Sequence, residues 1–302
     1  MTTKRPKVRK AVFPIGGLGT RFLPVTKALP KEMLPVIDRP LIQFVVEEAL
    51  KAGIEELIFV TGRGKEAIEN HFDIAFELER TLRDRGKFEI LEDVKACSLE
   101  PGCASYIRQQ EPKGLGHAVW CARHLVGEEP FAVLLADDLI LGGQASAMAE
   151  LLEVYAERGG QIVSVMDVPL AHVSRYGILA HEERKGATCV IKKIIEKPQP
   201  EEAPSQTAVI GRYILSPQIF AFLEQQNKAV SGEIQLTDAL AMTLKEGGSF
   251  TGVYLSGRRF DCGSREGMVC ATLFRALQDP TLAPLVQREI EEGREEERRK
   301  TS

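Results

Sequence analysis

The sequence lacks the features that mark several classes of protein. It has no apolar run as long as a membrane span, so we expect no membrane partner. Its six cysteines form no C-x-x-C pair and no zinc-like spacing, which favours reduced thiols in the cytoplasm. With 39 basic against 43 acidic residues the formal net charge is -4, so a nucleic-acid partner is not indicated. Any binding of phosphate must therefore depend on local groups.

Two common nucleotide-binding motifs are also missing. A P-loop needs Ser or Thr after Gly-Lys, but Gly64-Lys65 is followed by Glu66. A dinucleotide fingerprint needs a third glycine, and the stretch at residues 17–21 continues with Phe22 instead. Asp38 stands at a plausible distance for a ribose-binding acid, but it lies in a turn-rich segment. P-loop and dinucleotide-binding functions are therefore excluded.

The first turn of the chain nevertheless carries a glycine-rich loop. The apolar run at residues 11–15 predicts a buried strand, and glycines follow it directly from Gly16. Ligands of α/β sheets bind at the carboxyl ends of strands, where glycine lets backbone N–H groups approach phosphate oxygens. Arg21 and Lys31 add two cationic side chains nearby. This pattern is typical of a triphosphate cradle.

Strand and helix patterns alternate along the chain, which predicts an α/β fold with parallel βαβ units. The expected strands cover residues 57–61, 106–109, 131–135 and 162–166. The expected helices cover residues 41–52, 65–72, a stretch from 116, and 145–157. Residues 176–180 and 190–196 flank a polar turn and predict antiparallel strands in a small subdomain. The charged insertion at residues 77–105 supports no definite assignment.

Several blocks together resemble a known family. Gly17-Leu18-Gly19-Thr20-Arg21 and the segment at residues 30–35 match G-x-G-T-R followed by P-K-x-[ML]-[LV]-P. This signature is that of the nucleotidyltransferases that join a sugar 1-phosphate to a nucleoside triphosphate. The chain is most similar to the bacterial glucose-1-phosphate uridylyltransferases among them. Further blocks in family order, within residues 8–277, are 41–48, 69–73, 113–119, 196–198 and 232–239.

Two positions depart from the pattern of that subfamily. Gly17 stands where bacterial uridylyltransferases usually have alanine. The run Leu135-Ala136-Asp137-Asp138 replaces a Pro-Asp or Gly-Asp pair. Both changes keep the acid and the close approach of the backbone, so they bear on subfamily details rather than on the chemistry.

The resemblance implies a fold and an organisation. The fold would be that of nucleotide-diphospho-sugar transferases: a Rossmann-like, mixed, mainly parallel central sheet flanked by helices, with a small antiparallel sugar-side subdomain. Residues 1–277 would form the catalytic domain, with the nucleotide side at about 8–140 and the sugar side at about 160–265. Residues 278–302 would be a charged helix or tail. A homodimer or homotetramer is expected, because members of this family are commonly oligomers.

The resemblance also implies the reaction. The phosphate of glucose 1-phosphate would attack the α-phosphorus of UTP and release pyrophosphate, giving UDP-glucose. A phosphate monoester has a second pKa of about 6, so it needs no general base at neutral pH. Two anions must instead be aligned by cations. The same chemistry with dTTP or ATP is one alternative, and a catalytically silent sugar-nucleotide sensor is another.

Site residues follow from the matched motifs. Arg21 and Lys31 would be catalytic, since both face the triphosphate. Asp137 and Asp261 would bind Mg2+, which prefers carboxylates plus phosphate oxygens. Asp138 is the rival of Asp137, but neighbours on an extended segment point in opposite directions.

The remaining expected residues bind the two substrates. Gln109 and Gly114 would read the pyrimidine, although Gln109 could instead satisfy a loop. His117 would be a structural residue at a helix start. The nucleotide-binding set is Gly16, Gly17, Leu18, Gly19, Thr20, Glu32, Gln109 and Gly114. The sugar-phosphate-binding set is Gly177, Glu196, Lys197 and Gly211.

Overall fold

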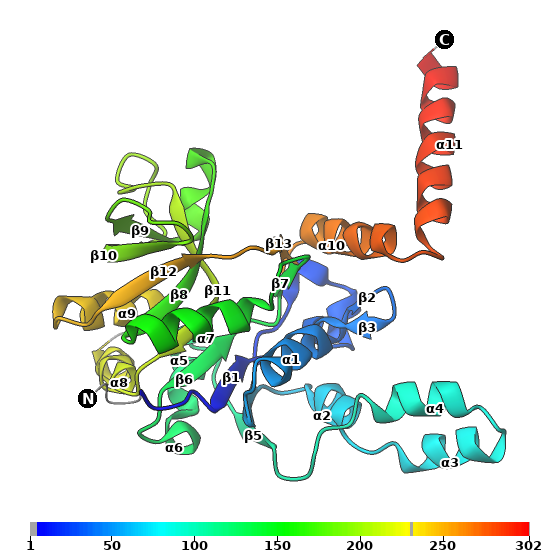
Figure 1. The fold of residues 1–302 in the computed structure, drawn as a ribbon, viewed down its shortest axis with the longest axis horizontal. Helices are drawn as coiled ribbons and strands as arrows, with labels where there is room; N and C mark the ends of the chain where they lie inside the picture. Colours follow the sequence, from blue (N-terminus) through cyan, green and yellow to red (C-terminus); the bar gives the residue numbers. More distant parts are fainter. Residues whose placement is uncertain (1–4, 230–231, 302) are drawn as a thin grey trace.

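The computed structural model describes residues 5–229 and 232–301 and shows an α/β fold around one mixed sheet (Figure 1). The nine strands of this sheet lie in the order β5-β4-β1-β6-β11-β8-β12-β10-β9. Their bounds are β1 Lys10–Pro14, β4 Glu56–Thr61, β5 Ala104–Arg108, β6 Phe131–Leu134, β8 Gln161–Asp167, β9 Gly177–His181, β10 Thr188–Glu196, β11 Thr207–Leu215 and β12 Phe250–Tyr254. The strands expected at 57–61, 106–109, 131–135 and 162–166 are thereby confirmed.

The first half of the sheet is parallel and creates the binding edge. Strand β1 lies between β4 and β6, and Val12 pairs with Ile58 on one side and Val133 on the other. The carboxyl ends of β1 and β6 therefore meet at one edge. A crevice opens where connections leave neighbouring strands in opposite directions, and such crevices bind ligands in α/β proteins.

Helices cover both faces of this sheet because successive strand residues point to opposite sides. Phe13 packs with buried residues of α1, α2 and α7, whereas Val12 packs with those of α5, α8 and α9. Figure 1 shows these helices on either side of the central strands. The helix bounds are α1 Leu41–Lys51, α2 Glu66–Phe72, α5 Leu115–Cys121, α7 Ala147–Arg158, α8 Ile219–Ala229 and α9 Leu236–Lys245. All four expected helices are among them.

The second half of the sheet is mixed. Strand β11 runs antiparallel to both β6 and β8, and β12 runs parallel to β8. The expected antiparallel pair is confirmed as β9 and β10, with Ile195 opposite Ile178. This pair does not form a separate sheet, since β10 also pairs with β12 and β9 with β11. Open strand edges are satisfied by pairing, so the antiparallel strands extend the central sheet.

A short antiparallel ribbon stands apart from the main sheet. It consists of β7 (Asp138–Leu141) and β13 (Arg258–Asp261), and it places Asp138 opposite Asp261. Its apolar side packs on α10 (Arg265–Gln278) through Leu139, Phe260 and Ala271. A second ribbon, β2 (Pro35–Val36) with β3 (Arg39–Pro40), adds Val36 to that cluster. The ribbon β7/β13 thus joins two distant parts of the sequence beside the binding edge.

The charged segments form helices that project from the body. The insertion at residues 77–105 folds largely as a pair of helices, α3 (Phe76–Asp84) and α4 (Phe88–Lys95), which project outward beyond α2 in Figure 1. The C-terminal segment is a helix, α11 (Ala283–Thr301), which extends away from the rest of the chain in the same view. The short α6 covers Arg123–Val126.

All six cysteines are free thiols, as the spacing predicts. None of the helices that the structure describes combines the length and the apolar character that crossing a bilayer requires.

Candidate active site

The glycine loop turns sharply after β1. Gly19 adopts φ 69, a left-handed conformation that favours glycine, and immediately precedes a 3-10 turn at Thr20–Phe22. The hydroxyl of Thr26 donates to the Gly19 carbonyl at 2.8 Å and fixes the turn. A side chain on Gly19 would also stand 3.1 Å from Cβ of Lys31. The loop is therefore shaped by its glycine and held against the segment that carries Lys31.

The two glycines before this turn differ in what surrounds them. A methyl group on Gly16 would stand 2.8 Å from Oε1 of Gln109, too close without a shift. A methyl group on Gly17 would meet only the end of Lys31, at 3.7 Å or more, which is ordinary contact. A methyl group at position 17 would therefore fit without a shift, whereas one at position 16 would not.

Lys31 points into the cleft from a 3-10 turn, Lys31–Met33. Its Nζ donates to Oδ2 of Asp137 at 2.6 Å. Burial alone would lower the pKa of the Lys31 ammonium, but the carboxylates of Asp137 and Glu32 outweigh it and raise that pKa. Burial would likewise raise the pKa of Asp137, yet Lys31 lowers it below its usual value. Both groups are therefore charged at neutral pH.

Asp138 has different partners from its neighbour. Its Oδ2 accepts the backbone N–H of Gly211 at 2.8 Å, and its Oδ1 accepts from Nε of Arg259 at 2.8 Å. A side chain on Gly211 would overlap Asp138, so the glycine permits this contact. Burial raises the pKa of Asp138 against the opposing effect of Arg259. The Asp138 carboxylate thus belongs to a buried ion pair.

The two expected magnesium ligands meet beside Gly263. A Cβ on Gly263 would stand 3.0 Å from Oδ2 of Asp137, 3.1 Å from Oδ1 of Asp261 and 3.5 Å from Nη1 of Arg21. The backbone N–H of Gly263 donates to Asp261 at 3.2 Å, and its carbonyl accepts from Arg21 at 3.4 Å. Within residues 5–229 and 232–301, no larger cluster of His, Cys, Asp and Glu suits a metal.

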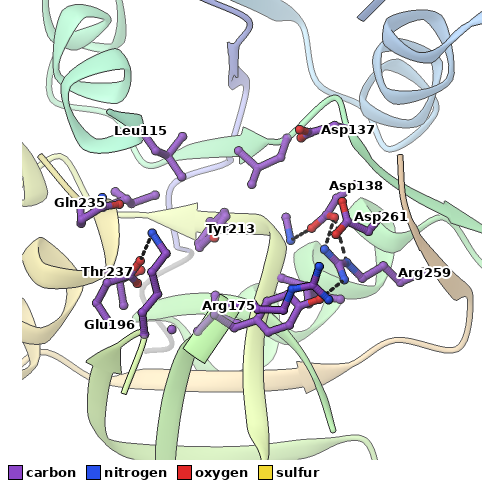
Figure 2. Close-up of a pocket in the computed structure, with 18 of the residues that line it drawn as sticks. Leu115, Asp137, Asp138, Arg175, Glu196, Tyr213, Gln235, Thr237, Arg259 and Asp261 are labelled. Atoms are coloured by element: carbon purple, nitrogen blue, oxygen red, sulfur yellow. Dashed lines mark hydrogen bonds and ion pairs between the residues drawn. The ribbon is translucent and has the colours of Figure 1, made fainter. Parts of the chain in front are cut away.

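A cavity of about 360 Å³ opens on the second half of the sheet (Figure 2). Among its lining residues are all four of the expected sugar-phosphate set. Lys197 has φ 44, and its Nζ lies 3.1 Å from Oε1 of Glu196. The other oxygen of Glu196, Oε2, is buried and has no hydrogen-bond partner among the described residues. A side chain on Gly177 would overlap Thr237, so the backbone lies against that wall.

A second cavity, of about 600 Å³, lies over the glycine loop. It is lined by the loop residues 16–21 together with Lys31, Gln109 and Gly114. Of the expected nucleotide-binding set, Glu32 is the exception. Its buried carboxylate accepts from Nζ of Lys65 at 2.6 Å, and burial raises the pKa of Glu32 despite this lysine. The structure therefore brings the rest of that set together and places Glu32 behind it.

The two cavities are neighbours that share part of their lining. Both are lined by Arg21, Leu115, Leu135, Asp137 and Gln235. Arg21 and Asp137 are thus the charged groups common to the two spaces. A molecule in one cavity would meet a molecule in the other beside these side chains.

Several lining residues were missed by sequence reasoning. They are Arg175, Tyr176, Tyr213, Gln235, Thr237 and Arg259, which all line the cavity of about 360 Å³. One signal was available for Arg259, because it stands two residues before Asp261 and alternate residues of a strand share a face. Its Nη1 donates to the hydroxyl of Tyr176 at 3.2 Å.

Comparisons with known proteins match most of the chain, and they all point to nucleotidyl transferases. Residues 10–275 match the family model described as nucleotidyl transferase. The UTP–glucose-1-phosphate uridylyltransferase of Bacillus subtilis (strain 168) is 49% identical over 276 residues, which cover 91% of this chain and 94% of that protein. The protein of the same name from Staphylococcus haemolyticus (strain JCSC1435) is 47% identical over 279 residues, 91% of this chain and 95% of that protein.

Solved structures show the same similarity. A UTP-bound UGPase from Acinetobacter baumannii has a TM-score of 0.86 at 40% identity, and the match covers 94% of this chain and 99% of that chain. A UDP-glucose pyrophosphorylase complexed with UDP-glucose has a TM-score of 0.79 at 41% identity, with 90% of this chain and 100% of that chain covered.

Proposed function

The chain belongs to the nucleotidyl transferase family, and from this we propose how its two cavities divide the work of a uridylyltransferase. The activity is that of a UTP–glucose-1-phosphate uridylyltransferase, which produces UDP-glucose. One observation carries the proposed division: the two cavities share a wall that contains Arg21 and Asp137. A transfer between two bound substrates needs such a shared wall, because the reacting groups must be aligned at one place.

UTP would occupy the larger cavity, over the glycine loop. Backbone N–H groups of this loop and the side chains of Arg21 and Lys31 supply the positive charge that a triphosphate needs. Gln109 and Gly114 lie in the same cavity and would contact the base. The contact between Gly16 and Gln109 supports this arrangement, since it joins the phosphate loop to the base-reading side chain.

Glucose 1-phosphate would occupy the smaller cavity. Lys197 is half exposed there and would hold the sugar phosphate. Glu196 has a buried carboxylate oxygen without a partner among the described residues, which is suited to accept hydrogen bonds from sugar hydroxyls. Gly177 and Gly211 would bring the backbone close to the sugar ring.

The chain's own residues would stabilise charge on the phosphates and align the two substrates, rather than transfer protons. The sugar phosphate is already ionised near neutral pH, so it can attack without a base. Arg21, at the junction of the cavities, would stabilise the charge that develops around the α-phosphorus. Lys31 is charged and close to this junction, and it would accompany the departing pyrophosphate.

The donor set at Gly263 fits a magnesium ion. Two carboxylate oxygens, of Asp137 and Asp261, converge on the space that a side chain at this position would fill. Mg2+ commonly takes one or two carboxylates and completes its shell with phosphate oxygens and water. When bound, the ion would neutralise charge on the reacting phosphates. Asp138 would not be a ligand, because Arg259 and Gly211 already hold its oxygens.

Asp261→Asn is expected to raise the magnesium concentration for half-maximal activity about tenfold, because it removes one of two anionic ligands. A magnesium titration of initial rates at saturating UTP and glucose 1-phosphate measures this. Asp84→Asn is the matched control, since its carboxylate is exposed on α3, remote from the site. An unchanged titration midpoint in Asp261→Asn would remove this residue from the proposed metal site.

We also propose the arrangement of the chain around this site. Residues of about 8–140 would form the nucleotide side and those of about 160–265 the sugar side of one catalytic domain. A homodimer or homotetramer would use α10 and α11, where Leu277 and Leu285 are exposed apolar side chains. Contiguous exposed apolar surface is typical of contacts between subunits.

Pyrophosphate release tests the proposed division between the cavities. The purified chain, magnesium and glucose 1-phosphate are combined with UTP, dTTP, ATP, CTP or GTP separately, and the wild type is expected to release pyrophosphate fastest with UTP. The variant Lys197→Ala should raise KM for glucose 1-phosphate and leave KM for UTP unchanged. A preference for dTTP or ATP would contradict the base assignment, and no release with any triphosphate would indicate a binding protein without turnover.

A further inference from the structure

The side-chain amide of Gln109 is held in one orientation. Its Nε2 donates to the carbonyl of Gly114 at 3.1 Å and lies 3.0 Å from Nδ1 of His117. An amide nitrogen has two hydrogens and no acceptor capacity, so both partners must be acceptors. Nδ1 of His117 is therefore unprotonated, and the ring is the neutral form with its hydrogen on Nε2.

This orientation turns the amide oxygen toward the nucleotide cavity. Oε1 of Gln109 is the atom against which Gly16 lies, 2.8 Å from the place of an added Cβ. Gly16 and Gln109 both line the cavity of about 600 Å³. Both hydrogen bonds of this side chain to described residues are made by Nε2, which leaves the oxygen without a donor among those residues. The cavity thus presents an acceptor, not a donor, at this point.

His117 is itself fixed by its surroundings. It is buried on α5, and its ring stacks on Trp120 with centroids 5.7 Å apart. Sγ of Cys121 lies 4.0 Å from the same Nδ1. Burial lowers the pKa of His117, Lys113 and Arg123 lower it further, and Glu111 opposes them. The neutral ring that the hydrogen bond requires is thereby favoured near neutral pH.

We infer that His117 is a positioning residue for base selection: it holds the Gln109 amide so that the oxygen accepts N3–H of uracil. The inference depends on the proposed binding of UTP in this cavity. Uracil carries a hydrogen on N3, whereas cytosine has an unprotonated N3 that a carbonyl oxygen would repel. Thymine has the same N3–H as uracil. His117 would therefore act on the choice between uracil and cytosine, not on that between uracil and thymine.

The variant His117→Phe tests this directly. Phenylalanine keeps an aromatic ring to stack on Trp120 and replaces the Nδ1 acceptor by C–H. We expect the ratio of kcat/KM for UTP to that for CTP to fall about five- to tenfold, the effect of losing one net hydrogen bond. The ratio for UTP to dTTP should stay unchanged, because the two bases share the edge that Gln109 reads.

His117→Asn is the matched variant, since its Oδ1 stands close to the place of Nδ1 and restores an acceptor. In this variant the ratio of kcat/KM for UTP to kcat/KM for CTP should return toward the wild-type value. A ratio for UTP to CTP that does not change in His117→Phe would overturn the inference. Equal falls in the UTP to CTP ratio and the UTP to dTTP ratio would also overturn the inference, because they would indicate that His117 has a purely structural role.

The inference and the proposed function fail in distinguishable ways. The dissociation constants of UTP, CTP and dTTP are measured by calorimetry for the wild type and both variants, independently of turnover. A wild type that binds UTP without releasing pyrophosphate would contradict the proposed reaction and still report the effect of His117. A wild type that turns over UTP, with the same UTP to CTP binding ratio in all variants, would overturn the role of His117 alone.

Discussion

Arg21→Ala is expected to lower kcat about 10²- to 10³-fold, the effect of removing one preorganised donor from a charged transition state. Arg21 lines both cavities, so its guanidinium stands where the two substrates would meet. Its single hydrogen bond within the described protein, to the carbonyl of Gly263, is long at 3.4 Å. The side chain is exposed, and its loss should therefore leave the free energy of unfolding within about 0.5 kcal/mol of the wild type.

Steady-state kinetics and denaturant unfolding of the same preparations separate these effects. Lys27→Ala is the matched control, because Lys27 is an exposed cation of the neighbouring turn and lines neither cavity. Arg21→Lys should recover part of the rate, since it keeps the charge but not the planar pair of donors. Turnover at the wild-type level in Arg21→Ala would exclude this residue from catalysis.

Glu48→Ala is expected to lower the free energy of unfolding by about 3–5 kcal/mol, the largest loss of stability that we predict. The variant leaves the buried guanidinium of Arg212 without its charged partner. Arg212 is fully buried, and it donates from Nε and Nη2 to the two oxygens of Glu48 at 2.9 and 2.7 Å. Glu48 also accepts the backbone N–H of Met148, at the start of α7. One carboxylate therefore joins α1, α7 and β11.

Denaturant unfolding of Glu48→Ala and Glu47→Ala provides the comparison. Glu47 is its neighbour on α1 and bonds Arg39, Gln43 and Lys51 near the surface. Partly exposed ion pairs contribute about 1 kcal/mol or less, so Glu47→Ala should be the milder change. Equal losses of unfolding free energy in the two variants would show that burial of the ion pair between Arg212 and Glu48 is not what makes Glu48 important for stability.

Much of the proposed nucleotide side could be predicted from the sequence because its signals are local. The glycine loop, Arg21 and Lys31 belong to one contiguous pattern after a strand, and the structure places them around one cavity. Asp137 lies shortly after the end of β6, and its carboxylate comes close to that of Asp261 beside Gly263. Short patterns of this kind fix both the local backbone and the direction of the side chains.

The proposed sugar side could be predicted less completely because segments that are distant in the sequence build it. Arg259 lies on β13 and Tyr176 lies just before β9, far apart in the chain, and no local period predicts their hydrogen bond. Glu32 shows the complementary difficulty. It shares a motif with Lys31, but successive residues of a 3-10 turn point in different directions, so one side chain faces the cleft and the other is buried against Lys65.

The helix pair α3 and α4 also had no clear sequence signal. Among their residues only Leu82 and Leu91 are buried, so these two helices pack few apolar side chains on the rest of the chain. Their charged faces are exposed, and charged surface alone does not distinguish a helix from a loop.

The continuity of the sheet limits how such an enzyme could be redesigned. The ladder between β6 and β11, with Tyr213 opposite Val133, lies at the border of the proposed nucleotide and sugar sides. Exchanging either half with that of another protein would cut through buried backbone hydrogen bonds, and a chimera made there would expose two unpaired edges. New specificities are therefore better sought by grafting the loops at the carboxyl edge than by recombining halves.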